Sequence, residues 1–269
     1  MILSAVWGAC RGDTTRLGYE IVERLPHDTA AYTQGLLFQG GRLYESTGTY
    51  GHSQLRRVDL ATGRVLAATS LPADRFGEGL AHIGDRLYQL TWQHSVGYIY
   101  DLATLALIDS FSYVGEGWGL TSDGTSLIMS DGSATLRFLN PTTFAVIREV
   151  TVQDDSSPLS SINELEYANG ELFANVYQSA WLVRVDPTSG RVLDWIDLID
   201  LVPGPLRGSR DDVLNGIAFD SESGHLLVTG KRWPVLYRVR LESTTGRESR
   251  RGSVDTRPNM RLQLPGAAK

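Results

Sequence analysis

The chain has 269 residues, of which 42% are hydrophobic and 21% charged, so it can bury a sizeable core in one large domain or two smaller ones. Its 25 basic and 31 acidic residues give a net charge of −6 without a basic stripe, which argues against nucleic acid and anionic membranes as partners. The single cysteine, Cys10, excludes an intramolecular disulfide framework and a cysteine-rich zinc site.

The first residues, MILSAVWGAC, are apolar and end in small residues before Cys10. This pattern resembles the end of a lipoprotein signal that lacks its basic start. We therefore expect residues 1–17 to be an N-terminal segment outside the fold and the protein to be secreted or periplasmic, with a lipid anchor on Cys10 as one form of attachment. A misassigned start site is the alternative. No other stretch has the roughly 18 to 20 apolar residues needed to cross a bilayer.

Five segments share one pattern of two short apolar strands joined by a turn through Gly, Asp or Asn. In chain order they are QGLLFQGGRLYEST from Gln34, EGLAHIGDRLYQLTW from Glu78, WGLTSDGTSLIMSDG from Trp118, NELEYANGELFANVY from Asn163 and NGIAFDSESGHLLVTGK from Asn215. Their starts lie 44, 40, 45 and 52 residues apart. A repeat of this length and content indicates the blades of a β-propeller.

A third strand follows each segment, and in the first four the turns DLATG, DLATL, NPTTF and DPTSG lead into a fourth strand. The fifth unit lacks a fourth strand, but YEIVERL at residues 19–25 precedes the first repeat and can supply it. We therefore predict an all-β, five-bladed β-propeller over residues 18–242, with the last blade closed by the N-terminal strand. Residues 243–269 lack periodicity and are expected to be a disordered tail.

Two rings of side chains follow from the repeat. The first strand of each blade lines the central channel, so residues that open equivalent strands gather at one mouth. These residues are Gln34, Glu78, Trp118, Asn163 and Asn215. The ends of the second strands return beside them, and the aligned positions there are Gly48, Trp92, Gly132, Tyr177 and Lys231. We therefore expect one carboxyl group, several amides and aromatic rings at a single mouth.

Ten stretches in this frame carry a resemblance to a known family. They are YTQGL, YESTGTYGHSQLRRVDLATG, FGEGL, LTW, GEGWGLTSDG, MSDGS, NELEY, DWIDL, VLNGIAFD and TGKRWP. In this order and spacing, over about residues 19–242, they resemble the plant and bacterial type of glutaminyl-peptide cyclotransferase, or glutaminyl cyclase. The resemblance implies a five-bladed propeller, unrelated to the zinc-dependent animal enzymes, that converts N-terminal glutamine of a peptide or protein to pyroglutamate with loss of ammonia.

The resemblance also implies roles for individual residues. Glu78 corresponds to the acid/base of the family. The residues that correspond to the substrate pocket are Gln34, Trp92, Trp118, Asn163 and Lys231. Tyr177 stands where relatives usually have a tryptophan, and it can still supply an aromatic wall for the substrate.

The expected reaction needs no nucleophile from the protein, because the α-amine of the substrate attacks its own γ-carboxamide. The protein must orient these two groups and move a proton from the amine to the departing ammonia. We expect a partly desolvated pocket to raise the pKa of Glu78 for this task. Glu116 and Asp131 lie near the same mouth by pattern but receive no role from the sequence.

We expect catalysis without a cofactor or catalytic metal, because the five histidines show no HExxH and no close pair with ligand spacing. The acidic loops at residues 153–158 and 208–213 leave a structural calcium ion open. Two alternatives remain: a propeller that binds peptide termini without turnover, and a metal-dependent hydrolase or lactonase propeller in which Glu78 and channel asparagines hold calcium. We expect a monomer.

Overall fold

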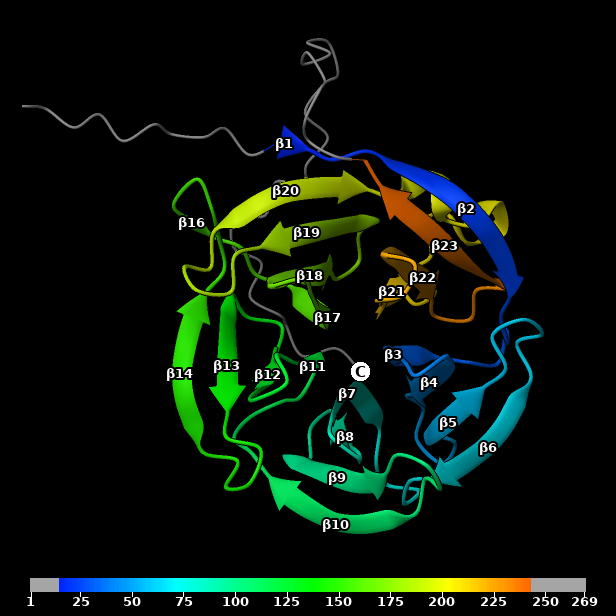
Figure 1. Cartoon of the computed structure of the whole chain (residues 1–269), viewed down its shortest axis with the longest axis vertical. Helices are drawn as coiled ribbons and strands as arrows, with labels where there is room; N and C mark the ends of the chain where they lie inside the picture. The colour runs from blue at the N-terminus through cyan, green and yellow to red at the C-terminus, as the bar shows by residue number, and fades with distance from the viewer. Residues whose placement is uncertain (1–14, 243–269) are drawn as a thin grey trace, which may run out of the picture.

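The computed structural model describes residues 15–242, which form four sheets of four strands and one of five, arranged around a central axis (Figure 1). This arrangement confirms the predicted all-β, five-bladed propeller. Cys10 and the predicted tail at residues 243–269 lie outside the described residues. Within residues 15–242, no helix has the length and apolar character needed to cross a membrane.

The first three blades follow one another along the chain, each from its innermost to its outermost strand. Blade 1 contains β3 (Thr33–Gln39), β4 (Arg42–Thr47), β5 (Gln54–Val58) and β6 (Val65–Ser70). Blade 2 contains β7 (Gly77–Ile83), β8 (Arg86–Thr91), β9 (Val96–Asp101) and β10 (Leu107–Ser112). Blade 3 contains β11 (Leu120–Ser122), β12 (Leu127–Met129), β13 (Thr135–Leu139) and β14 (Val146–Thr151).

The last two blades recruit strands from the N-terminal part of the described chain. Blade 4 contains β17 (Ile162–Ala168), β18 (Glu171–Val176), β19 (Trp181–Val185), β20 (Val192–Asp197) and, outside them, β1 (Thr15–Arg16). Blade 5 contains β21 (Leu214–Asp220), β22 (His225–Gly230), β23 (Val235–Leu241) and β2 (Tyr19–Pro26). The connections hold a small hairpin of β15 (Gln153–Asp154) and β16 (Ser157–Pro158) and the 3₁₀ helices η1 (Ile199–Leu201) and η2 (Gly204–Leu206).

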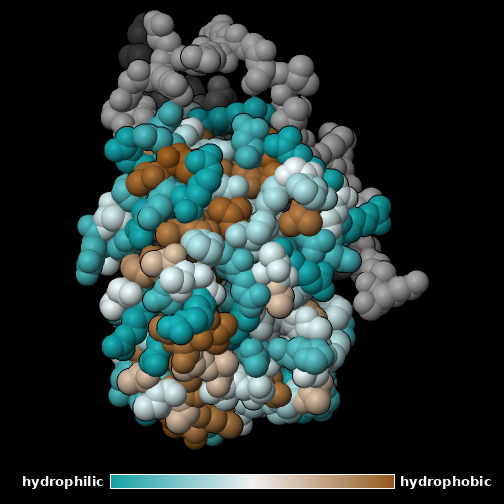
Figure 2. Space-filling view, turned by 90° about the vertical axis from the view of Figure 1, so that its right-hand side faces the viewer, coloured by the Kyte–Doolittle hydropathy of each residue, from teal (hydrophilic) through white to brown (hydrophobic). Residues whose placement is uncertain are grey.

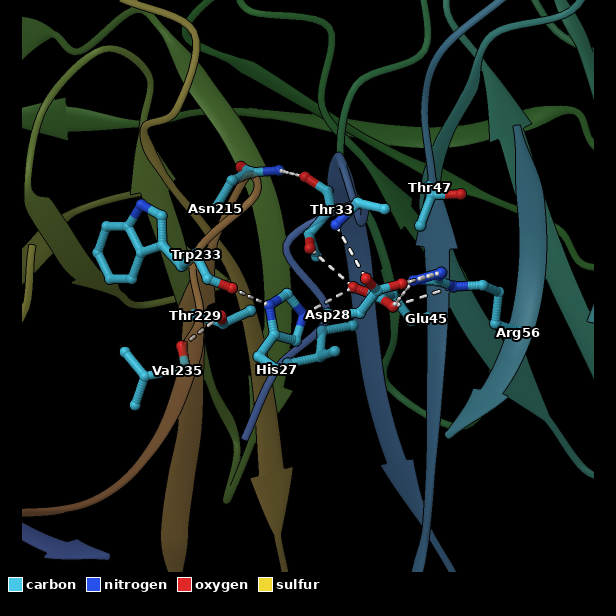
Figure 3. A network of polar contacts seen from close by, with 12 residues as sticks. His27, Asp28, Thr33, Glu45, Thr47, Arg56, Asn215, Thr229, Trp233 and Val235 are labelled. Atoms are coloured by element: carbon cyan, nitrogen blue, oxygen red, sulfur yellow. Dashed lines mark hydrogen bonds and ion pairs between the residues drawn. The ribbon is translucent and has the colours of Figure 1, made fainter. Parts of the chain in front are cut away.

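The N-terminal strand closes the ring, as the sequence predicts. β2 pairs antiparallel with β23, from Tyr19 opposite Leu241 to Pro26 opposite Val235. Directly after β2, His27 donates through Nδ1 to the carbonyl oxygen of Trp233 in blade 5 (2.7 Å), and its Nε2 lies 3.0 Å from Oε1 of Glu45 in blade 1 (Figure 3). Backbone pairing and a buried side-chain network therefore join the first and last blades.

One contact of the N-terminal part was not expected from the sequence. β1 pairs in parallel with β20, with Thr15 opposite Asp194 and Arg16 opposite Trp195, and Leu17 is buried in the hydrophobic core. The described fold thus begins at Thr15, within the N-terminal segment of residues 1–17 that was expected to lie outside it. A two-residue strand carries too little periodicity to be predicted.

Five hydrophobic clusters fill the five interfaces between neighbouring blades. One contains Leu37 of blade 1 and Leu80 of blade 2, and the four others repeat this arrangement around the ring. The outermost strands face solvent and still carry some apolar residues, such as Val22 and Leu66, which are 46% and 49% exposed. Figure 2 shows the side that carries β2 and β6, where hydrophobic residues are scattered among hydrophilic ones. The core therefore lies between the sheets and leaves the channel mouth free for polar groups.

Four of the five innermost strands have a β-bulge at the predicted mouth residues. In β3 the pairing register shifts between Thr33 and Gly35, on either side of Gln34. The equivalent shifts lie between Gly77 and Leu80 in β7, Ile162 and Leu165 in β17, and Leu214 and Ile217 in β21. Blade 3 differs, because β11 begins at Leu120, after Trp118. A bulge changes the direction of the side chain that it carries. In four blades, therefore, the same backbone irregularity directs one side chain toward the channel mouth.

Glycines after the mouth residues let the innermost strands approach closely. A Cβ atom on Gly79 would lie 2.3 Å from the backbone nitrogen of Leu120, and one on Gly119 would lie 2.0 Å from the carbonyl oxygen of Asn163. Blade 4 has Glu164 at this position, and its buried carboxyl accepts hydrogen bonds from the backbone of blades 1 and 5. Gly79, the glycine after Glu78, is therefore required by the close approach of the innermost strands.

Candidate active site

Four of the mouth residues form one chain of hydrogen bonds across neighbouring blades. Gln34 donates through Nε2 to Oε1 of Glu78 (2.9 Å). Asn215 donates through Nδ2 to Oε1 of Gln34 (3.2 Å), and Asn163 donates through Nδ2 to Oδ1 of Asn215 (2.9 Å). All four side chains are buried. We call Gln34, Glu78, Asn163 and Asn215 the polar chain; the structure brings together the residues that the repeat aligned.

The ends of the second strands return to this mouth in four of the blades. Equivalent backbone N–H groups donate to the residue that lies two positions before each mouth residue: Gly48 to Tyr32, Trp92 to Phe76, Tyr177 to Ser161 and Lys231 to Val213, at 2.8–3.0 Å. Blade 3 departs from the expected register, because the N–H of Trp118 donates to Ser130 (3.0 Å) and Gly132 instead accepts from Ser161 (2.7 Å). β11 and β12 have only three residues each, and backbone bonds between Trp118, Gly119 and Ser130 continue their pairing to the mouth.

Glu78 is the ionisable member of the polar chain. It is 5% exposed, and within the described residues its carboxyl receives one hydrogen bond, from Gln34. Burial raises the pKa of Glu78 well above its ordinary value of 4.5; the charge of Lys231 lowers this pKa, and that of Glu116 raises it. A carboxylate that loses hydration without gaining several donors favours its neutral form. Glu78 therefore keeps its proton to a higher pH than a solvated glutamate.

Lys231 faces Glu78 from blade 5. It is 3% exposed, and burial lowers its pKa to about 8, although the charges of Glu78 and Asp211 oppose this shift. Its Nζ lies 4.7 Å from the ring centroid of Tyr32 and 5.1 Å from that of Tyr177. Faces of aromatic rings attract a cation, so these tyrosines support a charge that burial disfavours.

Five aromatic side chains contact one another beside the polar chain. Phe76 makes edge contacts with Tyr32 (6.0 Å between centroids) and with Trp92 (5.8 Å). Trp118 makes an edge contact with Tyr177 (5.3 Å). We call Tyr32, Phe76, Trp92, Trp118 and Tyr177 the aromatic circle. Each of these side chains is partly exposed, unlike the buried polar chain, so the circle forms the outer part of the mouth.

Two charged side chains complete the aromatic circle. Glu116 accepts hydrogen bonds from the indole Nε1–H of Trp92 (2.8 Å) and of Trp118 (3.0 Å). Lys231 lies over the rings of both Tyr32 and Tyr177. Every neighbouring pair of aromatic residues in the circle is thus connected, either directly or through one charged group.

The structure places all seven residues predicted from the sequence, Glu78, Gln34, Trp92, Trp118, Asn163, Tyr177 and Lys231, in the polar chain, in the aromatic circle or against them. Sequence reasoning missed Tyr32 and Phe76 as members of the mouth. Each lies two residues before a mouth residue, so the same repeat alignment carried the signal for them. Asp131, which the repeat pattern placed near the mouth, forms an ion pair with Arg137 (2.7 Å).

Among residues 15–242, no three His, Cys, Asp or Glu side chains group in a way that could hold a metal ion. In the first acidic loop, Asp154 accepts a hydrogen bond from Nε1 of Trp195 (3.1 Å). In the second, Asp212 accepts from Ser209 (2.9 Å) and forms an ion pair with Arg232 (3.0 Å). These carboxylates are engaged with donors of the protein.

Comparisons with known proteins agree over almost the whole chain. A family model described as glutamine cyclotransferase matches residues 3–241. A glutaminyl-peptide cyclotransferase of Arabidopsis thaliana is 42% identical over 250 residues, which cover 90% of this chain and 78% of that protein. The crystal structure of Myxococcus xanthus glutaminyl cyclase is similar with a TM-score of 0.79 and 38% identity, covering 86% of this chain and 99% of that one. These matches span the blades that carry the polar chain and the aromatic circle.

Proposed function

The chain belongs to the glutamine cyclotransferase family, and we propose that Glu78 is the proton-transferring group with which it converts an N-terminal glutamine of a peptide or protein to pyroglutamate. The single observation that carries this proposal is the buried Glu78 carboxyl, which has one protein donor and a raised pKa. The proposed substrate-binding residues are Gln34, Trp92, Trp118, Asn163, Tyr177 and Lys231.

The reaction joins two groups of one substrate molecule. The α-amine nitrogen attacks the γ-carboxamide carbon, a C–N bond closes a five-membered ring, and the original C–N bond breaks to release ammonia. The amine loses a proton and the leaving nitrogen gains one, so no oxidant, water or second substrate is consumed. Orientation of an intramolecular attack is worth several kcal/mol when the reacting atoms are held in contact. The aromatic circle supplies flat walls for holding the glutamine side chain.

Glu78 can perform both proton transfers in turn. A free peptide amine has a pKa of about 7.7 to 8.0 and an ordinary glutamate about 4.3, so an ordinary glutamate is a weak base for this amine. The raised pKa of Glu78 brings the two groups closer, and general acid–base catalysis is most effective when donor and acceptor match. The oxygen that Gln34 does not contact is available to the substrate amine.

We assign the remaining polar groups to the carbonyl. Negative charge develops on the γ-carboxamide oxygen when the amine attacks, and a preorganised cation or N–H donor stabilises that charge. Lys231 lies on the Glu78 side of the mouth and has a pKa of about 8, so its charge is present at neutral pH. Asn163 donates one of its two Nδ2 hydrogens to Asn215 and carries no charge, so Lys231 is the better candidate for stabilising a negative oxygen.

Ammonia release from a Gln-initiated dipeptide tests this function. We expect stoichiometric ammonia and pyroglutamyl product from the wild type, no product from the same dipeptide with an acetylated amine, and no effect of a chelator. A propeller that only binds peptide termini would bind the dipeptide without releasing ammonia. A metal-dependent hydrolase would lose its activity with the chelator. Either result would overturn the proposal.

A further inference from the structure

Glu116 lies in the connection between β10 and β11, two residues before Trp118. Its Oε2 accepts the Nε1–H of Trp92 at 2.8 Å and the Nε1–H of Trp118 at 3.0 Å. Its Oε1 accepts from Nε2 of Gln93 at 3.2 Å. One carboxylate oxygen therefore holds two indoles that come from different blades.

This use of a carboxylate differs from that of Glu164 and Glu166, two buried glutamates of β17. Glu164 and Glu166 accept hydrogen bonds from backbone N–H groups and so connect strands. The donors to Glu116 within the described part of the chain are side chains, and two of them belong to the aromatic circle. An indole has a single donor, so this bond is the only hydrogen bond that can fix the rotation of each ring.

We propose that Glu116 is a positioning residue: it fixes the ring planes of Trp92 and Trp118 so that the substrate glutamine is held folded for attack by its own amine. The inference rests on the proposed function and deepens it. Bonds from N–H groups to a charged acceptor are roughly twice as strong as neutral ones. The two indoles touch Phe76 and Tyr177 on their other sides, so Glu116 sets the geometry of both halves of the aromatic circle.

Glu116 also acts on Glu78 through its charge. The charged side chains that bear on Glu78 are Lys231, which favours the carboxylate, and Glu116, which disfavours it. The hydroxyl groups of Tyr32, Tyr113 and Tyr177 also lie within electrostatic range of Glu78. Their raised pKa values leave them neutral below about pH 10, so removal of the Glu116 charge lowers the pKa of Glu78. A purely structural role of Glu116 in the loop would not have this effect.

Two substitutions separate geometry from charge. In Glu116→Ala both indoles lose their acceptor, and we expect kcat/KM to fall about 100-fold, the loss expected for a misplacement of roughly 1 Å. In Glu116→Gln the amide oxygen still accepts from the indoles while the charge is lost. We expect its kcat at the optimum pH to stay within about fivefold of the wild type, in contrast to the alanine variant. We also expect the acidic limb of its kcat/KM profile to move to lower pH. Glu149→Gln removes an exposed charge from blade 3 and serves as the control, with an unchanged profile.

The indole N–H resonances in a ¹H–¹⁵N spectrum measure positioning without turnover. We expect the Trp92 and Trp118 signals, assigned with single Trp→Phe variants, to move in Glu116→Ala and the signals of Trp195 and Trp233 to stay. Thermal unfolding checks that each variant is folded. If Glu116→Ala keeps kcat/KM within threefold and the indole signals do not move, the inference is wrong. If the wild type releases no ammonia but the two signals move, the proposed function is wrong and the positioning of the indoles stands.

Discussion

Two buried glutamates in neighbouring blades of this propeller have opposite surroundings. Glu45 of β4 is 1% exposed and Glu78 of β7 is 5% exposed. The carboxyl of Glu45 is satisfied by Nε2 of His27 (3.0 Å), by Thr33 Oγ1 (2.7 Å) and by Nη2 of Arg56 (3.1 Å), in the network that Figure 3 shows. Within residues 15–242, Glu78 receives one amide donor, from Gln34.

The difference in partners reverses the effect of burial. Burial raises the pKa of Glu45, but the hydrogen bond and charge of His27, together with Arg56 and Thr33, outweigh it and leave this pKa below its ordinary value. At Glu78 burial prevails and the pKa rises well above 4.5. Similar burial thus accompanies a lowered pKa at Glu45 and a raised pKa at Glu78, and only the raised pKa suits the proton transfer that we propose for Glu78. The two carboxyl groups thus differ in the number of hydrogen-bond donors that they receive, not in their burial.

The largest expected effect is on catalysis by Glu78→Gln. The amide keeps the hydrogen bond from Gln34 and the shape of the side chain but cannot accept the amine proton. We expect kcat to fall by about 10²- to 10⁴-fold, the usual range for general acid–base catalysis, with the unfolding temperature equal to or above that of the wild type. Ammonia release measured beside a thermal melt checks both. Full activity of this variant would remove Glu78 from the mechanism.

The next effect is on stability, through Glu45→Gln. This change removes one partner of a buried ion pair and leaves Arg56 and His27 without their shared carboxylate, which typically costs about 3 to 5 kcal/mol of unfolding free energy. We expect kcat per folded molecule to stay within a few fold of the wild type at temperatures where the variant is folded. Urea unfolding measures the unfolding free energy, and ammonia release at low temperature measures kcat per folded molecule. A lost kcat in a folded variant would place Glu45 in the site.

The pH dependence of stability has opposite signs at the two positions. The raised pKa of Glu78 means that its contribution to stability is complete below about pH 4.5 and is lost as the pH rises through the folded-state pKa. The lowered pKa of Glu45 means that its contribution is present above about pH 4.5 and is lost as the pH falls through its folded-state pKa. We therefore expect the unfolding free energy of Glu78→Gln to rise relative to that of the wild type as the pH rises. As the pH falls, we expect Glu45→Gln to lose less unfolding free energy than the wild type does. Stability curves against pH that run parallel for wild type and variants would contradict the comparison.

The smallest expected effect concerns the aromatic circle. Tyr177→Trp places at this position the indole that the resemblance to the family implies, beside Trp118 and under Nζ of Lys231. Trp is the strongest aromatic partner of a cation, and a whole cation–π contact at an exposed site is worth about 0.5 to 1 kcal/mol, which bounds the gain. We expect KM for a Gln-initiated dipeptide to fall about two- to fivefold with kcat nearly unchanged. Tyr177→Leu is the control, and it should raise KM. A change confined to kcat would show that Tyr177 acts on the chemical step.

Much of this arrangement can be predicted from the repeat. Because strands of equivalent register return to the same place in every blade, the alignment of Gln34, Glu78, Asn163 and Asn215 in the sequence is enough to predict that their side chains meet. The bulges that re-aim these side chains could not be predicted, because innermost strands such as β3 and β7 are buried on both faces and so lack the alternation in which an inserted residue would show as a change of phase. The two indoles on Glu116 and the three partners of Glu45 were also missed, because they depend on side-chain rotamers and on contacts between distant segments.

The pH dependence of kcat for the wild-type enzyme saturated with a Gln-initiated dipeptide tests the role of Glu78 most directly, because this profile reports ionisations in the enzyme–substrate complex and not that of the free substrate amine. We predict an acidic limb with a midpoint well above pH 4.5, set by Glu78, and a limb near pH 8 where Lys231 loses its charge. An acidic limb at or below pH 4.5 would contradict the claim that burial with a single donor prepares Glu78 to transfer protons.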